Sequence, residues 1–298
     1  MAISTVNQPV SLWQQYFALC KPKVVSLILF TAFAGMLLAS QGIPDLKQMF
    51  WGLVGIGLAA SSAAAINHVV DQRIDRIMMR TSRRPLAIGM LNTAQASSFA
   101  ITIGIISMVI LTYFINPLTA ILTFSSLIGY AVIYTVFLKY RTPQNIVWGG
   151  AAGAMPPLLG WCAITGDVTL EPIFLFLIIF IWTPPHFWAL AIHRKKEYEQ
   201  AKVPMLPVTH GVAHTKLQIL LYSIALFVIS LLPYFFGFSH LLYLLAAVIL
   251  NVGFVYHTWS LYRSDNNKLA MKTFTFSITY LTILFASLLL DHFLMQVI

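Results

Sequence analysis

The sequence predicts an all-α, polytopic membrane protein that forms one domain over residues 1–298. Hydrophobic residues make up 59% of the chain and charged residues only 9%, whereas a soluble domain carries about 25% charged residues. The charges lie at the ends of long uncharged runs, and each run is long enough for one or two membrane helices of roughly 20 residues. These runs do not alternate in polarity, as the strands of a membrane β-barrel do.

The uncharged runs predict nine membrane-spanning helices. Five runs hold one span each, and two longer runs hold two spans each, turning at Asn116-Pro117 and near Pro233 to His240. The expected spans cover roughly residues 24–44, 48–68, 95–115, 118–138, 145–165, 172–192, 217–236, 240–260 and 273–291.

Lysine and arginine predict the orientation, because these residues concentrate in cytoplasmic loops. With a cytoplasmic N-terminus, 17 of the 18 basic residues fall inside and only Lys47 falls outside, and the C-terminus is then outside. No cleavable signal or Arg/Ser-rich transit segment precedes the first span, so we expect a bacterial inner (plasma) membrane, with the lipid bilayer as the surrounding medium. The net charge of +9 is scattered over the inner segments and indicates no nucleic-acid partner.

A polar stretch follows the second predicted span. Asn67, Asp71 and Asp75 are spaced four apart, so on a continuing helix they occupy an arc of roughly 80°. Magnesium prefers such oxygen ligands, and it binds through one or two carboxylates together with substrate phosphate. Arg80 and Arg84 would suit the remaining phosphate oxygens. The stretch therefore predicts an aspartate–magnesium–diphosphate site.

The alternative interpretation is that these charges only mark the membrane surface. Arginine side chains extend to the interface in many membrane proteins, and aspartates pair with them there. The regular fourfold spacing of the three oxygen-bearing side chains favours the metal site over this interpretation.

A second polar loop follows the sixth predicted span. Thr183-Pro184-Pro185 predicts a broken helix that restarts with Thr183 as its N-cap. On that helix His186, His193 and Glu197 would share one face within about 40°. Glu197 follows span six much as Asp71 follows span two, which indicates a weak internal repeat with a site at its interface. The alternative is that the histidines are packing or helix-end residues.

Further basic and small residues lie beside the spans. On spacing alone, Lys21-Pro22-Lys23 and the group of Lys139, Arg141 and Asn145 are sufficiently explained as orientation signals. The segment Gly149-Gly150-Ala-Ala-Gly153 predicts close helix packing.

These residues resemble a known family. The first polar stretch, written Asn67-x3-Asp71-x3-Asp75-x4-Arg80-Thr81-x2-Arg84-Pro85-Leu86, resembles the first signature of the UbiA-type intramembrane prenyltransferases. Other segments resemble the branch of that family that farnesylates heme, namely Trp182-Thr-Pro-Pro-His-Phe-Trp-Ala-Leu190, Val203-Pro-Met-Leu-Pro207 and Arg141-Thr-Pro-Gln-Asn145. The likeness covers roughly residues 20 to 290. Glu197 stands in place of the family's second aspartate-rich motif, and Lys23 stands where arginine is common.

The resemblance implies helices around a central cavity and the transfer of farnesyl from farnesyl diphosphate to a vinyl group of heme B, giving heme O. It implies Mg²⁺ as cofactor and an active site toward the cytoplasmic face. The product would be consumed by heme-copper oxidase assembly or by heme A synthase. The implied metal ligands are Asn67, Asp71 and Asp75. The implied diphosphate ligands are Arg80, Arg84, Arg141 and Lys23, and the heme side is formed by His186, His193, Glu197, Lys196 and Lys202.

Two other functions compete with this expectation. A transporter or channel would place ionisable residues in the middle of its spans, whereas all nine acidic and all 18 basic residues lie at span ends or in loops. A prenyltransferase acting on a phenolic acceptor such as 4-hydroxybenzoate would share the first polar stretch. The segment around His186 favours heme over such an acceptor.

Overall fold

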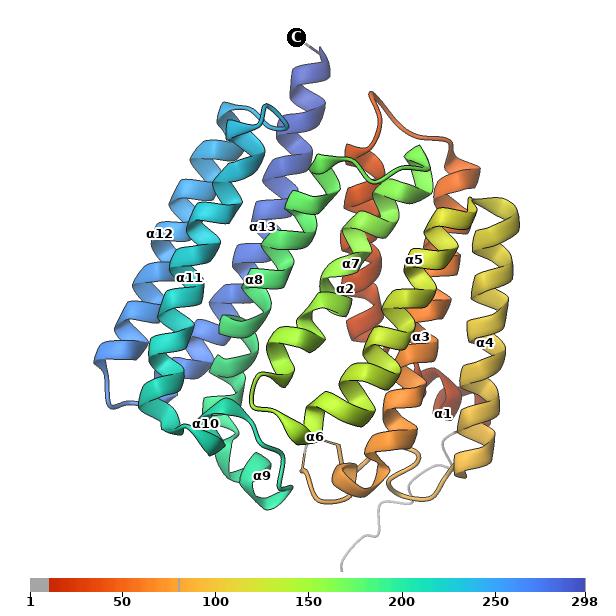
Figure 1. The fold of residues 1–298 in the computed structure, drawn as a ribbon, viewed down its shortest axis with the longest axis vertical. Helices are drawn as coiled ribbons and strands as arrows, with labels where there is room; N and C mark the ends of the chain where they lie inside the picture. The colour runs from red at the N-terminus through yellow and green to blue at the C-terminus, as the bar shows by residue number, and fades with distance from the viewer. Residues whose placement is uncertain (1–10, 80, 298) are drawn as a thin grey trace, which may run out of the picture.

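All regular structure in the described residues is helical. The computed structural model describes residues 11–79 and 81–297, and it contains no strand in these ranges. The elements lie side by side in one bundle (Figure 1). They are α1 (Leu12–Leu19), α2 (Pro22–Leu38), α3 (Leu46–Asp75), α4 (Thr93–Phe114), α5 (Pro117–Ile128), the π-helix η1 (Gly129–Leu138), α6 (Lys139–Arg141), α7 (Asn145–Thr165), α8 (Leu170–His193), α9 (Lys195–Gln200), α10 (Leu206–Thr209), α11 (Gly211–Phe235), α12 (Leu241–Arg263) and α13 (Lys268–Val297). The predicted all-α class is confirmed.

The described helices include seven that are long and apolar enough to cross a membrane. An eighth is added if α1 and α2, which meet at 51°, form one broken span. α7, with 21 residues, is not among them. Its many glycine and proline residues lower its mean hydropathy. Each of the nine predicted ranges overlaps a helix, but the count of nine spans stays a prediction.

Among the described helices that could span a membrane, α3 and α8 are the most deeply buried. In the apolar windows of α3 and α8, 56% and 61% of the residues are buried, whereas only 17% are buried in α4 and in the segment Pro117–Arg141. Figure 1 shows α4 and α12 at opposite edges of the bundle. The apolar side chains on the peripheral helices are therefore available to lipid, and the two polar sequence stretches continue from the buried helices.

The length of α3 explains how it carries a polar end. Its 30 residues rise about 45 Å, which exceeds the roughly 30 Å of a bilayer's hydrocarbon core. Asp45 caps its first turn by accepting from the backbone N–H groups of Lys47 and Gln48. The helix persists to Asp75, so the predicted arc lies on one helix, and the exposed Arg73 points away from the buried side.

The course of α8 differs from the sequence prediction. The helix runs unbroken from Leu170 to His193 through Pro184 and Pro185, and Thr183 is not an N-cap. The Thr183 hydroxyl instead donates to the carbonyl of Ile179, 2.7 Å away. Prolines are tolerated inside membrane helices because neighbouring helices and hydroxyl side chains compensate for lost backbone bonds. The predicted restart at Thr183 is therefore wrong.

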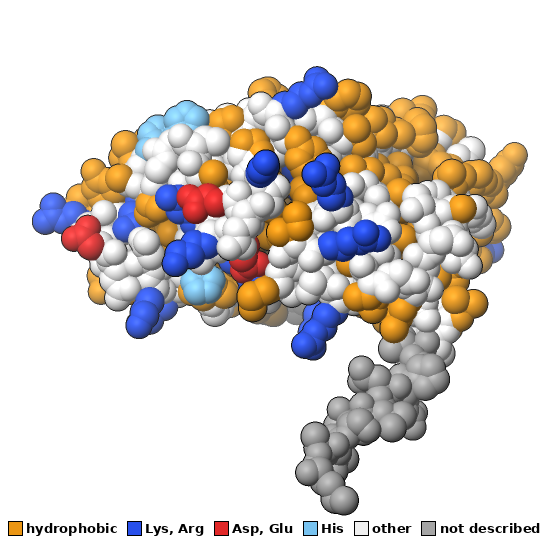
Figure 2. All heavy atoms as spheres, turned by 90° about the horizontal axis from the view of Figure 1, so that it is seen from below, with side chains coloured by type: hydrophobic (Ala, Val, Ile, Leu, Met, Phe, Trp, Pro, Cys, Tyr) orange, Lys and Arg blue, Asp and Glu red, His pale blue; other side chains and the backbone are white. Residues whose placement is uncertain are grey.

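One end of the bundle is strongly basic. We call the end at which Asp75 ends α3 and His193 ends α8 the basic end. α6, α9 and α10 also lie at this end, and the C-terminus lies at the opposite end (Figure 1). Figure 2, which looks at this end, shows Lys and Arg side chains spread over the surface with few Asp and Glu side chains between them. That this end faces the cytoplasm stays a prediction.

α2 and α7 approach each other closely through a reciprocal pair of glycines. A Cβ atom added at Gly35 would lie 2.0 Å from the carbonyl oxygen of Pro157, and one added at Gly160 would lie 2.0 Å from the carbonyl oxygen of Ala32. Small residues allow this approach between membrane helices. The predicted close packing of the Gly149 segment holds for Gly149 and Gly150, which face side chains of neighbouring helices, and is wrong for Gly153, which has open space around its Cβ position.

We predict that Gly160→Ala lowers the thermal unfolding midpoint of the detergent-purified protein. The added methyl must push apart two helix backbones, and overpacking of this kind costs about 1–3 kcal/mol. Gly153→Ala on the same helix is the matched control, because nothing lies within 4 Å of its added methyl. Equal midpoints for the two variants would contradict the close approach.

Candidate active site

The three residues of the predicted arc are buried at the basic end of α3. Asn67, Asp71 and Asp75 are only 5%, 3% and 3% exposed. The side-chain amide of Asn67 donates to Asp71 Oδ2 at 2.8 Å, so these two side chains are in contact. Buried carboxylates need compensating partners, because an unpaired charge loses its hydration.

Asp71 is bound by two side chains from α6. Lys139 Nζ lies 2.5 Å from Asp71 Oδ2, and the Tyr140 hydroxyl donates to Asp71 Oδ1 at 2.7 Å. The Lys139 side chain is 12% exposed, so this ion pair is largely shielded from solvent. Both oxygens of Asp71 are thus engaged.

Asp75 and Asn67 are bound by cations from two further segments. One guanidinium nitrogen of Arg84, Nη1, contacts both oxygens of Asp75 at 2.7 and 2.8 Å. Lys21 Nζ donates to Asn67 Oδ1 at 2.5 Å. We call these six side chains the carboxylate–cation cluster: Lys21, Asn67, Asp71, Asp75, Arg84 and Lys139. It holds three cations and two carboxylates and so carries a surplus positive charge.

A π-helix brings α6 to the cluster. η1 continues α5 and is followed directly by α6, and π-helical turns occur frequently at functional sites. Thr135 of η1 is fully buried, with its Oγ1 3.5 Å from Asn67 Nδ2. The wider turn therefore changes which side chains of this segment face α3, and Lys139 and Tyr140 are among those that do.

Sequence reasoning missed Lys21, Lys139 and Tyr140 as site residues. The sequence explains Lys21 and Lys139 as orientation signals, and the neighbouring basic residues Lys23 and Arg141 give no indication of which lysine or arginine turns inward. Only the tertiary contacts identify them.

Two of the four predicted diphosphate ligands, Arg141 and Lys23, do not join the cluster. Arg80 lies outside the described residues. Arg141 is exposed, with its guanidinium 5.5 Å from the centre of the Phe137 ring. Lys23 is also exposed, because α2 begins at Pro22 and directs it away from the cluster. Among the three that the structure describes, Arg84 is at the arc.

The arc fits a magnesium ion that is held partly by substrate oxygens. The described residues contain no group of three His, Cys, Asp or Glu that could hold a metal, but magnesium needs only one or two carboxylates when phosphate completes its shell. Asn67 and Asp75 are eight residues apart, about 12 Å along the helix axis, whereas magnesium–oxygen bonds are about 2.1 Å. One ion therefore cannot bind both ends of the arc, and Asp71 with one neighbour is the fitting pair.

The second predicted group is not one helix face. α8 ends at His193, and Glu197 lies on the separate helix α9. His186 is only 8% exposed, whereas His193 is exposed. The prediction that His186, His193 and Glu197 share a face is wrong, because Arg194 takes a non-helical conformation (φ −104°, ψ 20°) between them.

The charges around α9 are partly paired. Arg194 Nη1 contacts Glu197 Oε1 at 3.0 Å, and Lys195 contacts Glu199 at 3.3 Å. The other oxygen of Glu197, Oε2, is buried without a partner among the described residues. Lys196 and Lys202, by contrast, are exposed and make no ion pair in the described part of the chain.

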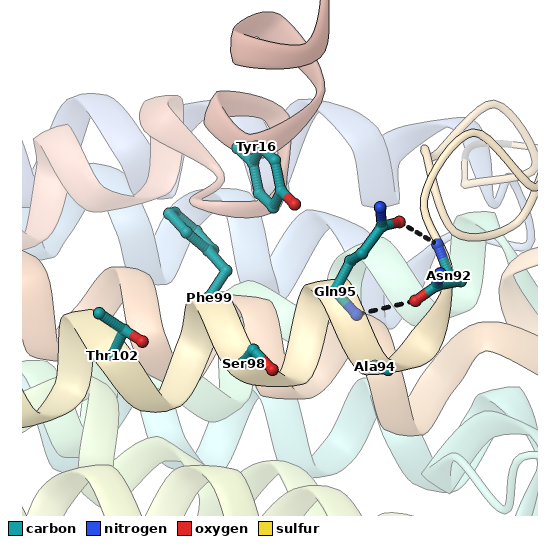
Figure 3. A pocket seen from close by; sticks show the side chains of 7 residues that line it. All are labelled: Tyr16, Asn92, Ala94, Gln95, Ser98, Phe99 and Thr102. Carbon is teal, nitrogen blue, oxygen red and sulfur yellow. Dashed lines mark hydrogen bonds between the residues drawn. The ribbon is translucent and has the colours of Figure 1, made fainter.

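Two surface hollows lie away from the cluster. One lies between α1 and α4, where Asn92 and Gln95 bond each other's backbone N–H groups (Figure 3). Its lining residues are Tyr16, Asn92, Ala94, Gln95, Ser98, Phe99 and Thr102. The other is lined by Tyr234, Asp291 and their neighbours, where α11, α12 and α13 meet. Neither hollow includes an arc residue.

The cluster can accept a polyanion beside an apolar bundle. Arg84 and Lys139 are held in place by the carboxylates and Lys21 by the amide oxygen of Asn67, so these side chains need not be ordered when a ligand arrives. Such preorganised charge lowers barriers at which negative charge develops. A phosphate-bearing group is the natural ligand of such cations.

Comparison with known proteins agrees with this chemistry. Residues 28–288 match the UbiA prenyltransferase family. A protein named protoheme IX farnesyltransferase from Thioalkalivibrio sulfidiphilus (strain HL-EbGR7) is 58% identical over 281 residues, covering 94% of this chain and 93% of its own. A protein of the same name from Nitrosococcus oceani is 56% identical over 292 residues, covering 98% of both chains.

Solved structures share the fold at low sequence identity. A structure from work on digeranylgeranylglyceryl phosphate synthase in membranes superposes with a TM-score of 0.81 at 20% identity, covering 94% of this chain and 98% of the other. A UbiA homolog from Archaeoglobus fulgidus bound to DMAPP and Mg²⁺ gives 0.65 at 16% identity, covering 92% and 99%. With the family match over most of the chain and relatives alike over nearly their full length, this chain belongs to the UbiA prenyltransferase family.

Proposed function

We propose that this chain transfers the farnesyl group of farnesyl diphosphate to a vinyl group of heme B, giving the hydroxyethylfarnesyl heme called heme O. The carboxylate–cation cluster carries the proposal. The choice of heme as acceptor is supported by relatives of 54–58% identity that are named protoheme IX farnesyltransferase.

The cluster suits the departure of diphosphate. The bond between farnesyl C1 and the diphosphate oxygen breaks with both electrons leaving on oxygen, so negative charge grows there while an allylic cation forms. Lys21, Lys139 and Arg84 converge on the arc and would receive that charge without rearrangement of solvent. The apolar chain of the substrate would lie toward the membrane part of the bundle.

Asp71 and Asn67 are the residues that we assign to Mg²⁺, because their side chains touch through Asn67 Nδ2 and Asp71 Oδ2 and each carries oxygen atoms that magnesium can bind. Asn67 would offer Oδ1, which accepts from Lys21 in this structure. When bound, Mg²⁺ neutralises diphosphate oxygens and so makes diphosphate a better leaving group. Asp75 orients Arg84 through both carboxylate oxygens. Lys139, which contacts Asp71 in this structure, would then turn partly from Asp71 to the diphosphate oxygens.

The acceptor half of the reaction needs apolar surroundings. The vinyl electrons attack farnesyl C1 and form the new carbon–carbon bond, which leaves a cation on the vinyl carbon next to the porphyrin. Water adds to that carbon and loses a proton, which gives the hydroxyl group of heme O. Water must be kept from the farnesyl cation until the vinyl group attacks, and apolar side chains on the membrane helices serve that purpose.

The second polar loop provides groups for heme. Lys196 and Lys202, which are exposed and without ion pairs in the described residues, suit the heme propionates. We assign His186 to the porphyrin itself, because it lies about 10 Å from the end of α8, inside the membrane part. His193 and Glu197 are assigned to the rim of the same site.

The bacterial relatives support an inner-membrane location. We expect the basic end to face the cytoplasm, following the distribution of positive charge. The product would pass to heme-copper oxidase assembly or to heme A synthase.

We predict that the purified protein converts heme B and farnesyl diphosphate to heme O only when a divalent metal is present. The reason is that the arc presents oxygen ligands beside phosphate-binding cations. Mass spectrometry of the heme product measures the reaction. Undiminished turnover in excess chelator would reject the metal, and prenylation of 4-hydroxybenzoate without heme farnesylation would favour the phenolic acceptor.

We predict that Asp71→Asn and Asp75→Asn each lower turnover on the order of 10²-fold or more, because the first removes a charged ligand of Mg²⁺ and the second removes the carboxylate that orients Arg84. Asp45→Asn is the matched control, since it makes the same change at the opposite end of the same helix, where asparagine also caps well. Thermal unfolding in detergent verifies that the variants fold. Near-wild-type turnover of both arc variants at saturating Mg²⁺ would mean that the arc only marks the membrane surface.

A further inference from the structure

We infer that Ser277 on α13 fixes the tautomer and orientation of His186, so that His186 presents the lone pair of Nε2 to the iron of bound heme. This inference rests on the proposed function, in which heme is the substrate. Ser277 is a positioning residue, and it is fully buried at 0% exposure.

The imidazole of His186 is clamped between two aromatic rings. The Trp182 ring stacks on the imidazole at a centroid distance of 4.2 Å and an interplanar angle of 19°. The Phe274 ring also stacks on it, at 4.5 Å and 26°. Phe187 approaches edge-on at 5.1 Å. The ring plane is therefore set by packing, and its hydrogen bonds decide which edge carries the proton.

The hydrogen bonds around Ser277 assign that proton. Its hydroxyl lies 2.6 Å from the carbonyl oxygen of Phe274, and a carbonyl can only accept, so the hydroxyl proton points there. The same hydroxyl oxygen lies 2.6 Å from His186 Nδ1. Since the hydroxyl has no second proton, Nδ1 must donate, and Nε2 carries the lone pair in the neutral ring.

The other ring nitrogen, Nε2, is left without a partner among the described residues. It makes no hydrogen bond in the described part of the chain, and it is not fully buried. Part of the 8% exposure of His186 therefore belongs to this edge. An unprotonated ring nitrogen of this kind is the commonest metal ligand among side chains.

Heme iron fits this nitrogen better than a free metal ion does. The described residues contain no group of three His, Cys, Asp or Glu that could hold an ion by themselves. Heme iron needs only one such ligand, because the porphyrin supplies the equatorial nitrogens. A histidine that ligates a metal almost always donates its other ring N–H to a fixed partner, and Ser277 provides that partner here.

The test uses the full-length protein in detergent, titrated with ferric heme B and followed by the Soret band. We expect Ser277→Ala to weaken heme binding about 10–100-fold, the usual cost of losing such a partner. His186→Ala should shift the Soret band and weaken binding at least as much, and added imidazole should restore the spectrum.

The controls separate positioning from folding. Ser277→Ala keeps the backbone carbonyl that accepts from Trp182 Nε1 at 2.9 Å, so only the hydroxyl is lost. Ser287→Ala on the same helix removes a buried hydroxyl that bonds only the Leu284 carbonyl, at 2.8 Å, and should leave heme binding unchanged. Ser277→Thr retains the hydroxyl and should bind heme as the wild type does.

The outcomes are distinct. Wild-type heme binding and spectrum in Ser277→Ala, with altered binding in His186→Ala, would overturn the role of Ser277. An unchanged spectrum in His186→Ala would overturn iron ligation. In both cases heme O formation by the wild type would leave the proposed function standing. A wild-type protein that neither binds heme nor forms heme O would reject the proposed function, and this inference with it.

Discussion

The pairing of Asp71 and Asp75 with cations from other segments determines how the basic end of the molecule is built. Two carboxylates that are 3% exposed on one helix cannot stay charged without partners. Lys139 comes from the segment after η1, Arg84 from the turns after α3, and Lys21 from the connection between α1 and α2. Removing one partner of such a buried pair typically costs about 3–5 kcal/mol, so these contacts join three chain segments to α3.

Because the paired charges gather at the end of α3, the molecule has a charged end and an apolar body. This arrangement suits prenyl transfer. Diphosphate requires concentrated positive charge, whereas an allylic cation requires protection from water. The cluster lies at the end of α3, and α3 and α8 are the most deeply buried of the apolar helices described. A substrate with a charged head and a long apolar tail can therefore satisfy both requirements only by lying across the boundary between the two parts.

Sequence reasoning recovered what depends on spacing along one helix and missed what depends on contacts between helices. The fourfold spacing of the arc places Asn67, Asp71 and Asp75 together on α3 because a helix repeats regularly. Lys21 rather than Lys23 reaches the arc because Lys21 precedes the helix in a left-handed conformation (φ 50°). Lys139 rather than Arg141 faces α3 because η1 is wound as a π-helix, which no local pattern indicates. The unbroken α8 shows the same limit, since packing overrides the usual effect of Pro184 and Pro185.

The affinity of the protein for inorganic pyrophosphate in the presence of Mg²⁺ tests the central claim most directly, because it isolates the diphosphate site from both apolar substrates. If the cluster is that site, Lys139→Met weakens pyrophosphate binding at least about tenfold, as loss of a buried charged contact does. Lys272→Met, which removes an exposed lysine from α13, leaves binding as in the wild type, and removal of Mg²⁺ weakens binding in the wild type. Equal pyrophosphate affinities for the wild type and Lys139→Met would contradict the account.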